Sequence, residues 1–197
     1  EQIAAVVEHA HGLGMRVHLD GARIANAAAS LGLPIRAFTS DVGVDVVSFG
    51  GTKNGALAAE AVVVLDPAAS EGLTFLRKTD MQLASKMRFV SAQLIALLDG
   101  DLWLRSAGHA NAMARRLRDA VVDLPGVTIA RPVEANAVFA ILPDGVADQL
   151  REVFRFYDWD RATREVRWMC AFDTTPEDVD AFASALARLV SVAPVTA

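Results

Sequence analysis

The chain has 197 residues, of which 53% are apolar and 22% charged, and its formal net charge is −5. This acidic balance, without a basic cluster, argues against nucleic acid as a partner. No apolar run approaches the ~20 residues of a membrane helix, and the single cysteine, Cys170, excludes an internal disulfide and favours a reducing cytoplasm.

The first part of the chain alternates helices and strands. The spacing of apolar residues predicts helices over 1–11 and 22–31, and short apolar runs predict strands over 15–19, 44–49 and 60–65. The run over 44–49 is apolar at almost every position, which is typical of a strand buried on both faces. This order indicates an α/β fold with a mostly parallel sheet covered by helices.

Helices dominate the middle of the chain, and a second α/β segment follows. Helices are predicted over 68–78, 80–99 and 102–122. Beyond the turn at 124–126 the pattern predicts strands at 127–130, 137–142, 154–157 and 165–171, with helices at 144–152 and 176–190. We therefore expect three parts: a cofactor-binding large domain over 1–100, a connecting helix over 101–126, and a small C-terminal domain over 127–197.

Two short segments carry the chemistry. His18–Arg23 reads HLDGAR and Ser48–Gly55 reads SFGGTKNG, and each follows a strand-like run. They place Asp20 and Lys53 where two neighbouring strands end. A carboxylate for the ring nitrogen and an amine for the aldehyde are what a pyridoxal phosphate enzyme needs.

Lys53 is the candidate for the covalent link. The glycines before it let the backbone approach a ligand closely, and a partly desolvated lysine can form a Schiff base. The alternative is a lysine that is simply solvated on a loop. A nucleotide phosphate loop is excluded, because that motif requires Lys before Ser or Thr and here Thr52 comes first.

Asp20 is the candidate partner of the ring nitrogen, although a role as the N-cap of the next helix is the common alternative. Arg23 follows three residues later and can lie on the same side. His18 alternates with Asp20 along the strand and so shares its face. His18 can equally be a core histidine with satisfied hydrogen bonds.

These segments strongly resemble the low-specificity L-threonine aldolases, which are pyridoxal phosphate enzymes of the aspartate-aminotransferase fold. The resemblance also includes Phe75–Lys78, Ser85–Val90, Arg131–Asn136 and Val166–Trp168. It implies that Lys53 holds the cofactor, that Asp20 pairs with its ring nitrogen, and that Arg23 lies by its phenolic oxygen. It also implies that an N-terminal segment of such an enzyme precedes residue 1.

The same resemblance implies roles for basic residues further along. Lys78 would lie near the substrate or the cofactor phosphate, and Lys86 or Arg88 would reach the phosphate of a neighbouring subunit. Arg167 would bind the substrate α-carboxylate, which suits a planar, bidentate guanidinium. Trp103, Trp159 and Trp168 are expected to be packing residues, although Trp168, next to Arg167, is also a candidate for the site entrance.

The implied reaction is retro-aldol cleavage of L-threonine, L-allo-threonine or a related β-hydroxy-α-amino acid to glycine and an aldehyde. We expect a cytoplasmic homodimer or homotetramer and, without ligands at metal spacing, no catalytic metal. Two alternatives stay open. One is another lyase or a transaminase of the same fold type. The other is a truncated, inactive chain that acts only in oligomerisation.

Overall fold

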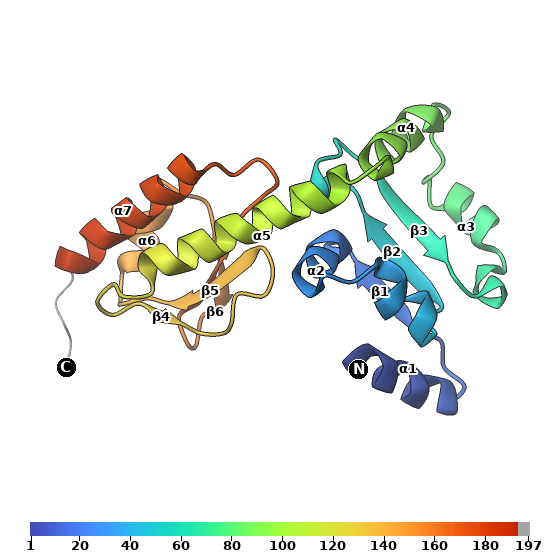
Figure 1. The fold of residues 1–197 in the computed structure, drawn as a ribbon, viewed down its shortest axis with the longest axis horizontal. Helices are drawn as coiled ribbons and strands as arrows, with labels where there is room; N and C mark the ends of the chain where they lie inside the picture. The colour runs from blue at the N-terminus through green and yellow to red at the C-terminus, as the bar shows by residue number, and fades with distance from the viewer. Residues whose placement is uncertain (193–197) are drawn as a thin grey trace. The chain divides into compact units, whose positions relative to one another are not determined.

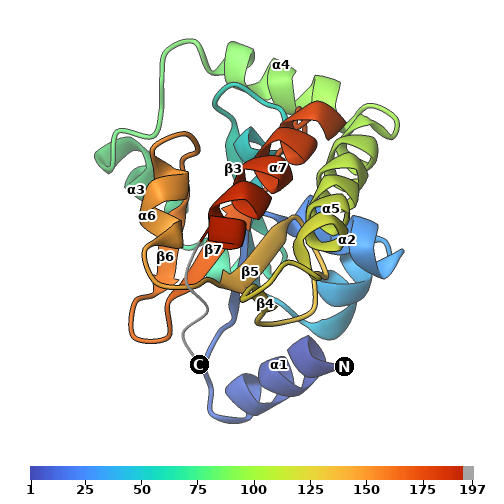
Figure 2. The ribbon, with the colours of Figure 1, turned by 90° about the vertical axis from the view of Figure 1, so that its left-hand side faces the viewer.

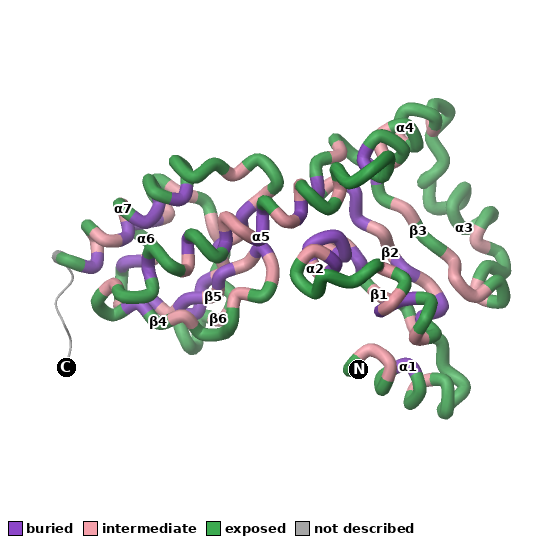
Figure 3. The backbone as a smooth tube through the Cα atoms, viewed as in Figure 1, coloured by how far each residue is buried: buried purple, intermediate pink, exposed green. Residues whose placement is uncertain are grey.

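The structure is a computed structural model that describes residues 1–192, with the side chains of residues 1–191. The chain divides into two compact units, Glu1–Ser106 and Ala107–Ala197. The border falls inside α5 (Leu102–Val121), the helix that the sequence predicts as the connection between domains. Each unit has its own core of buried residues (Figure 3).

The first unit is a three-stranded sheet with helices (Figure 1). Its strand order is β1-β2-β3. The elements are α1 (Gln2–Gly12), β1 (His18–Gly21), α2 (Ile24–Leu31), β2 (Val46–Gly50), β3 (Glu60–Val64), α3 (Leu73–Thr79) and α4 (Met87–Leu98). This alternation confirms the predicted α/β class.

The sheet of the first unit is mixed in direction. Strands β1 and β2 are parallel, whereas β2 and β3 are antiparallel. The connection between β2 and β3 comprises only residues 51–59. A parallel crossover needs about a dozen residues or more, so this short loop imposes a hairpin. The parallel arrangement predicted from the sequence therefore holds for β1 and β2 but not for β3.

The two faces of this sheet have different surroundings. Leu19, Val47 and Phe49 face the first core, whose buried members come from α1, α2 and the segment before β2. Because side chains alternate along a strand, Asp20 and Ser48 lie on the other face. The core thus fixes which face carries the polar residues.

The predicted helix over 80–99 is shorter in the structure. Met81 has a φ of +58°, a left-handed conformation that no α-helix accepts, and α4 begins only at Met87. The predicted helix over 68–78 is likewise divided. A 3₁₀ turn at Pro67–Ser70 is separated from α3 by Gly72, which has a φ of +73°.

The second unit has an antiparallel sheet of order β4-β5-β7-β6. Its elements, besides most of α5, are β4 (Thr128–Ile129), β5 (Ala137–Ile141), α6 (Val146–Arg151), β6 (Tyr157–Asp160), β7 (Glu165–Met169) and α7 (Pro176–Val192). Figure 2 shows α5, α6 and α7 on one side of this sheet, where the second core lies.

The start of α7 agrees with its sequence signal. Thr175 Oγ1 accepts the backbone N–H of Asp178 at 3.1 Å, and Asp178 Oδ2 accepts the backbone N–H of Thr175 at 2.9 Å. Such reciprocal capping stabilises a helix N-terminus. The backbone N–H and the hydroxyl of Thr175 both donate to the Asp178 carboxylate, and these two hydrogen bonds lower the pKa of that carboxyl below its usual value. None of the helices within residues 1–192 is both long enough and apolar enough to cross a bilayer.

Candidate functional site

The predicted acid and lysine lie at the same edge of the first sheet. Strands β1 and β2 run parallel, with Asp20 opposite Ser48 and Gly21 opposite Phe49. Asp20 is thus one residue before the end of β1, and Lys53 lies in the 3₁₀ turn Thr52–Asn54 directly after β2. In open α/β sheets, ligands bind outside this carboxyl edge.

The two strand ends are in direct backbone contact. A Cβ placed on Gly50 would lie 2.4 Å from the carbonyl oxygen of Ala22, and one on Gly21 would lie 2.7 Å from that of Ser48. Only glycine fits at such positions. On Gly51 a Cβ would lie 2.5 Å from the carbonyl oxygen of Ala59. The expectation that Gly50 and Gly51 make room for a ligand is corrected: their open side is filled by this chain's own backbone.

Asp20 is exposed and forms a local turn. Its Oδ1 accepts the backbone N–H of Ala22 at 3.0 Å. The N-cap of α2 is Arg23, so Asp20 does not cap that helix. No hydrogen bond to Asp20 Oδ2 is formed within the described part of the chain. The turn thus fixes one of the two carboxylate oxygens of an exposed side chain.

His18 is tied to a residue that the sequence analysis did not single out. Its Nε2 lies 2.7 Å from Ser48 Oγ, across the β1–β2 pair. His18 is exposed, which differs from a buried core histidine. The signal for Ser48 was its position two residues before Gly50, because alternation places it on the face of Asp20. His18, Asp20 and Ser48 form one polar group at this edge.

The loop that carries Lys53 is held by side chains on both sides. Thr52 Oγ1 accepts the backbone N–H of Ala59 at 3.1 Å. Asn54 is buried and donates from Nδ2 to the backbone carbonyl of Trp103 at 2.8 Å. From α4, Gln93 Oε1 accepts the backbone N–H groups of Leu57 and Ala58 at 2.9 and 3.2 Å.

Lys53 itself is exposed. This differs from the expectation of a partly desolvated amine. The physical reason is local: within the turn, Asn54 is the buried residue that packs against the protein, whereas Lys53 faces outward. No hydrogen bond or ion pair to Lys53 is formed within the described residues, so its amine is available to a ligand.

The other basic residues of the first unit are more dispersed. Arg23 is half-buried at the start of α2, beside the Asp20 turn. Lys78 is exposed on α3, and Lys86 is exposed at the N-cap of α4. Within the described residues, neither lysine forms a hydrogen bond or ion pair with Asp20 or Lys53. Their predicted roles stay predictions.

Arg167 belongs to the second unit, on β7. It is half-buried, and its guanidinium carbon lies 5.0 Å from the centre of the Trp159 ring. It has no carboxylate partner within the described residues. Trp168 points the opposite way and is 2% exposed in the second core. The packing role expected for Trp168 is therefore confirmed, and its alternative place at the site entrance is wrong; Trp159 is the tryptophan beside Arg167.

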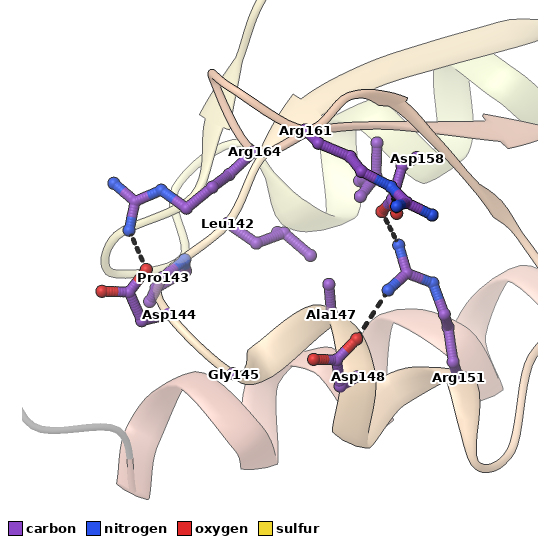
Figure 4. Close-up of a pocket in the computed structure, with 11 residues that line it drawn as sticks. Leu142, Pro143, Asp144, Gly145, Ala147, Asp148, Arg151, Asp158, Arg161 and Arg164 are labelled. Carbon is purple, nitrogen blue, oxygen red and sulfur yellow. Dashed lines mark hydrogen bonds and ion pairs between the residues drawn. The ribbon is translucent and has the colours of Figure 1, made fainter.

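A pocket of about 240 Å³ opens between α6 and the turn from β6 to β7 (Figure 4). Its charged lining is internally neutralised: Arg151 pairs with Asp148 and Asp158, and Arg164 pairs with Asp144. Because each of these five side chains already has an ion-pair partner, none of them offers an unpaired charge to a charged ligand. Among the described residues no cluster of three or more His, Cys, Asp or Glu could hold a metal ion.

Comparison with known proteins gives consistent results. A family model described as beta-eliminating lyase matches residues 1–144. The chain is 41% identical over 180 residues to a low-specificity L-threonine aldolase of Pseudomonas aeruginosa, covering 91% of this chain and 52% of that protein. It is 38% identical over 192 residues to the corresponding enzyme of a Pseudomonas species, covering 97% and 55%.

The fold also matches a solved structure. The threonine aldolase of Leishmania major superposes with a TM-score of 0.83 at 25% identity, covering 95% of this chain and 56% of that one. The predicted resemblance is confirmed in both sequence and fold. The chain spans about half the length of the curated relatives it matches.

Proposed function

Because this chain belongs to the beta-eliminating lyase family, we propose that it carries the lysine and acid of a pyridoxal phosphate enzyme. The proposed reaction is retro-aldol cleavage of L-threonine, L-allo-threonine or a related β-hydroxy-α-amino acid to glycine and an aldehyde. The substrate class follows the names of the relatives, which are threonine aldolases.

One observation carries the proposal. The backbone contact between Gly50 and Ala22 joins the Asp20 turn to the end of the strand that leads into Lys53. An exposed carboxylate and an exposed amine thereby share one sheet edge, on two strands held in fixed register. This edge therefore offers an acid and an amine to one ligand at the carboxyl ends of the parallel strands.

The residues at this edge fit pyridoxal phosphate in their chemistry. Lys53 would hold the aldehyde carbon through its amine, Asp20 would keep a proton on the ring nitrogen, and Arg23 would lie by the phenolic oxygen. His18, fixed by Ser48, would border the ring. When bound, the cofactor supplies an electron sink for the carbanion left as the Cα–Cβ bond breaks.

The remaining proposed contacts concern substrate and phosphate. Arg167 would hold the α-carboxylate with its two outer nitrogens, because a guanidinium matches a carboxylate bidentately. Lys78 and Lys86 would serve a phosphate, Lys86 that of a neighbouring copy of the chain. A homodimer or homotetramer in the cytoplasm is part of this proposal.

The test uses the fact that the sequence has three lysines: Lys53, Lys78 and Lys86. The purified chain is mixed with pyridoxal phosphate, reduced with borohydride and mapped by peptide mass. Before reduction, we expect the yellow absorbance band of a Schiff base between pyridoxal phosphate and a lysine. After reduction, we expect the adduct on Lys53. Lys53→Ala should abolish the adduct. Lys78→Ala, which removes a proposed phosphate contact and leaves the Lys53 amine in place, should still form the adduct on Lys53.

Acetaldehyde release from L-threonine is measured on the same samples. An adduct on Lys53 with threonine cleavage supports the proposal. Labelling spread evenly over the three lysines, or persistence of the cofactor band in Lys53→Ala, contradicts the role of Lys53. Amino transfer to a ketoacid without acetaldehyde contradicts the aldolase reaction while leaving the cofactor site intact.

A further inference from the structure

Four side chains form a continuous stack on the face of the second sheet that lies away from its core. The guanidinium of Arg131 lies 4.3 Å from the centre of the Phe139 ring. The Phe139 and Trp159 rings meet edge to face, with centroids 5.1 Å apart and an interplanar angle of 75°. Arg167 completes the stack, 5.0 Å from the Trp159 ring.

The two arginines at the ends of this stack differ in one respect. Arg131 is ion-paired with Glu165 on β7, so its charge is neutralised. Arg167 has no carboxylate partner among the described residues, and its Nε is buried without a hydrogen bond. An aromatic ring, rather than an anion, therefore restrains Arg167. A cation held in this way keeps its hydrogen-bonding edge for another molecule.

The local backbone explains how Trp159 reaches this position. Tyr157 pairs with Arg167 and Asp158 with Val166, but the next pair is Asp160 with Glu165. Trp159 is thus the extra residue of a β-bulge. Bulges re-aim side chains and occur beside binding sites. Trp159 is 50% exposed, and its indole lies against Arg167 without a partner residue across the ladder.

We propose that Trp159 is a positioning residue that holds the Arg167 guanidinium in the orientation needed to bind a carboxylate. The ligand that Arg167 would bind is a small carboxylate. That this carboxylate belongs to the amino-acid substrate rests on the proposed function. Stacking limits the rotamers of a long side chain, so less conformational entropy is lost when the carboxylate binds. The indole also contributes direct cation–π attraction to the guanidinium.

The first measurement does not depend on cofactor or turnover. The ¹H–¹⁵N signal of Arg167 Nε is recorded in the full chain and assigned by its disappearance in Arg167→Lys. Stacking over an indole should move the chemical shift of this proton away from the usual value for arginine. It should also slow the exchange of the proton with water. Trp159→Leu should abolish both effects, whereas Trp159→Phe, which retains a ring face, should preserve them in part.

The second measurement uses acetate as the carboxylate probe, followed through the same signal. Loss of a cation–π contact should weaken acetate binding by about twofold to thirtyfold in Trp159→Leu, with a smaller loss in Trp159→Phe. Val153→Ala is the control, because Val153 is an exposed apolar residue before β6 that takes no part in the stack. We expect it to bind acetate as the unmodified chain does.

The third measurement is glycine binding by the cofactor-loaded chain, compared with methylamine, which lacks a carboxylate. Trp159→Leu should weaken the binding of glycine and leave the binding of methylamine unchanged. If Trp159→Leu leaves the Arg167 signal and acetate affinity as they were, the positioning role is overturned. If acetate responds as expected and glycine does not bind even the unmodified chain, the positioning role stands and the proposed function fails.

Discussion

Asn54 donates a hydrogen bond from Nδ2 to the backbone carbonyl oxygen of Trp103 at 2.8 Å. The contact joins the residue after Lys53 to the start of α5, 49 residues further along the chain. Asn54 is 4% exposed, so the bond is shielded from water. The position of Lys53 thus depends on a long-range contact made by its neighbour.

Asn54→Ala should destabilise the chain by about 1–3 kcal/mol, because a shielded carbonyl loses its partner. Urea unfolding measures this change. Gln82→Ala is the control, since the Gln82 amide forms its hydrogen bond at an exposed position and should shift stability by no more than about 0.5 kcal/mol. Equal effects of the two substitutions would refute the special role of the buried amide.

Gln93 allows the anchor on the other side of the Lys53 loop to be tested. Gln93→Glu keeps an accepting oxygen, whereas Gln93→Met keeps the length and removes the acceptor. Hydrogen exchange at the amides of Leu57 and Ala58 should accelerate by about tenfold in Gln93→Met, since one net hydrogen bond is lost. The exchange rate should stay near the original value in Gln93→Glu. Acceleration in both variants would mean that the hydrogen bonds accepted by Gln93 Oε1 do not restrain the loop.

Gly50→Ala should strongly destabilise the first unit. The added Cβ would lie 2.4 Å from the carbonyl oxygen of Ala22, a backbone atom that cannot turn aside as a side chain can. Gly108→Ala is the matched control, because nothing lies within 4 Å of a Cβ there and alanine favours a helix by about 1 kcal/mol. The melting temperature should fall in Gly50→Ala and should not fall in Gly108→Ala.

Asp45 should make the stability of the first unit depend on pH. It is buried, and hydrogen bonds from the backbone N–H of Val17 and from His11 hold the pKa of its carboxyl below the usual value. Between the folded and unfolded pKa values the unfolded chain binds the proton more readily, so the stabilisation rises with pH. It is complete above the unfolded value of about 3.9 and is lost as pH falls through the lowered folded value.

The measurement is chemical unfolding of the original chain and of Asp45→Asn at pH 7 and in the acid range. The variant should be less stable at pH 7, and the difference should shrink as the pH falls below about 4. A difference that is independent of pH would show that the ionised carboxylate is not responsible.

Cys170 should resist thiol reagents while the chain is folded. The thiol is buried in the second core, and burial raises its pKa to about 11. At pH 8 only about one thiol in a thousand is then ionised, and the thiolate is the reactive form. Ellman's reagent should therefore react slowly with the native chain and rapidly after addition of denaturant. Equally rapid reaction in both states would contradict this assignment.

The sequence by itself determined the α/β class, most helices and strands, and the residues at the sheet edge. These depend on short-range properties: the period of apolar residues, the capping signal at Thr175, and the motifs that contain Asp20 and Lys53. The local pattern did not determine where 80–99 breaks, because the left-handed φ at Met81 is not encoded by a glycine.

The tertiary structure alone decided which distant residues meet. The short loop after β2 set the direction of β3, strand register placed Ser48 beside His18, and the fold of the first unit placed Gln93 beside the Lys53 loop. In the second unit, alternation turned Trp168 into the core, and a bulge placed Trp159 against Arg167. The physical reason is that such contacts depend on register, loop length and packing between segments far apart in sequence, which no local pattern records.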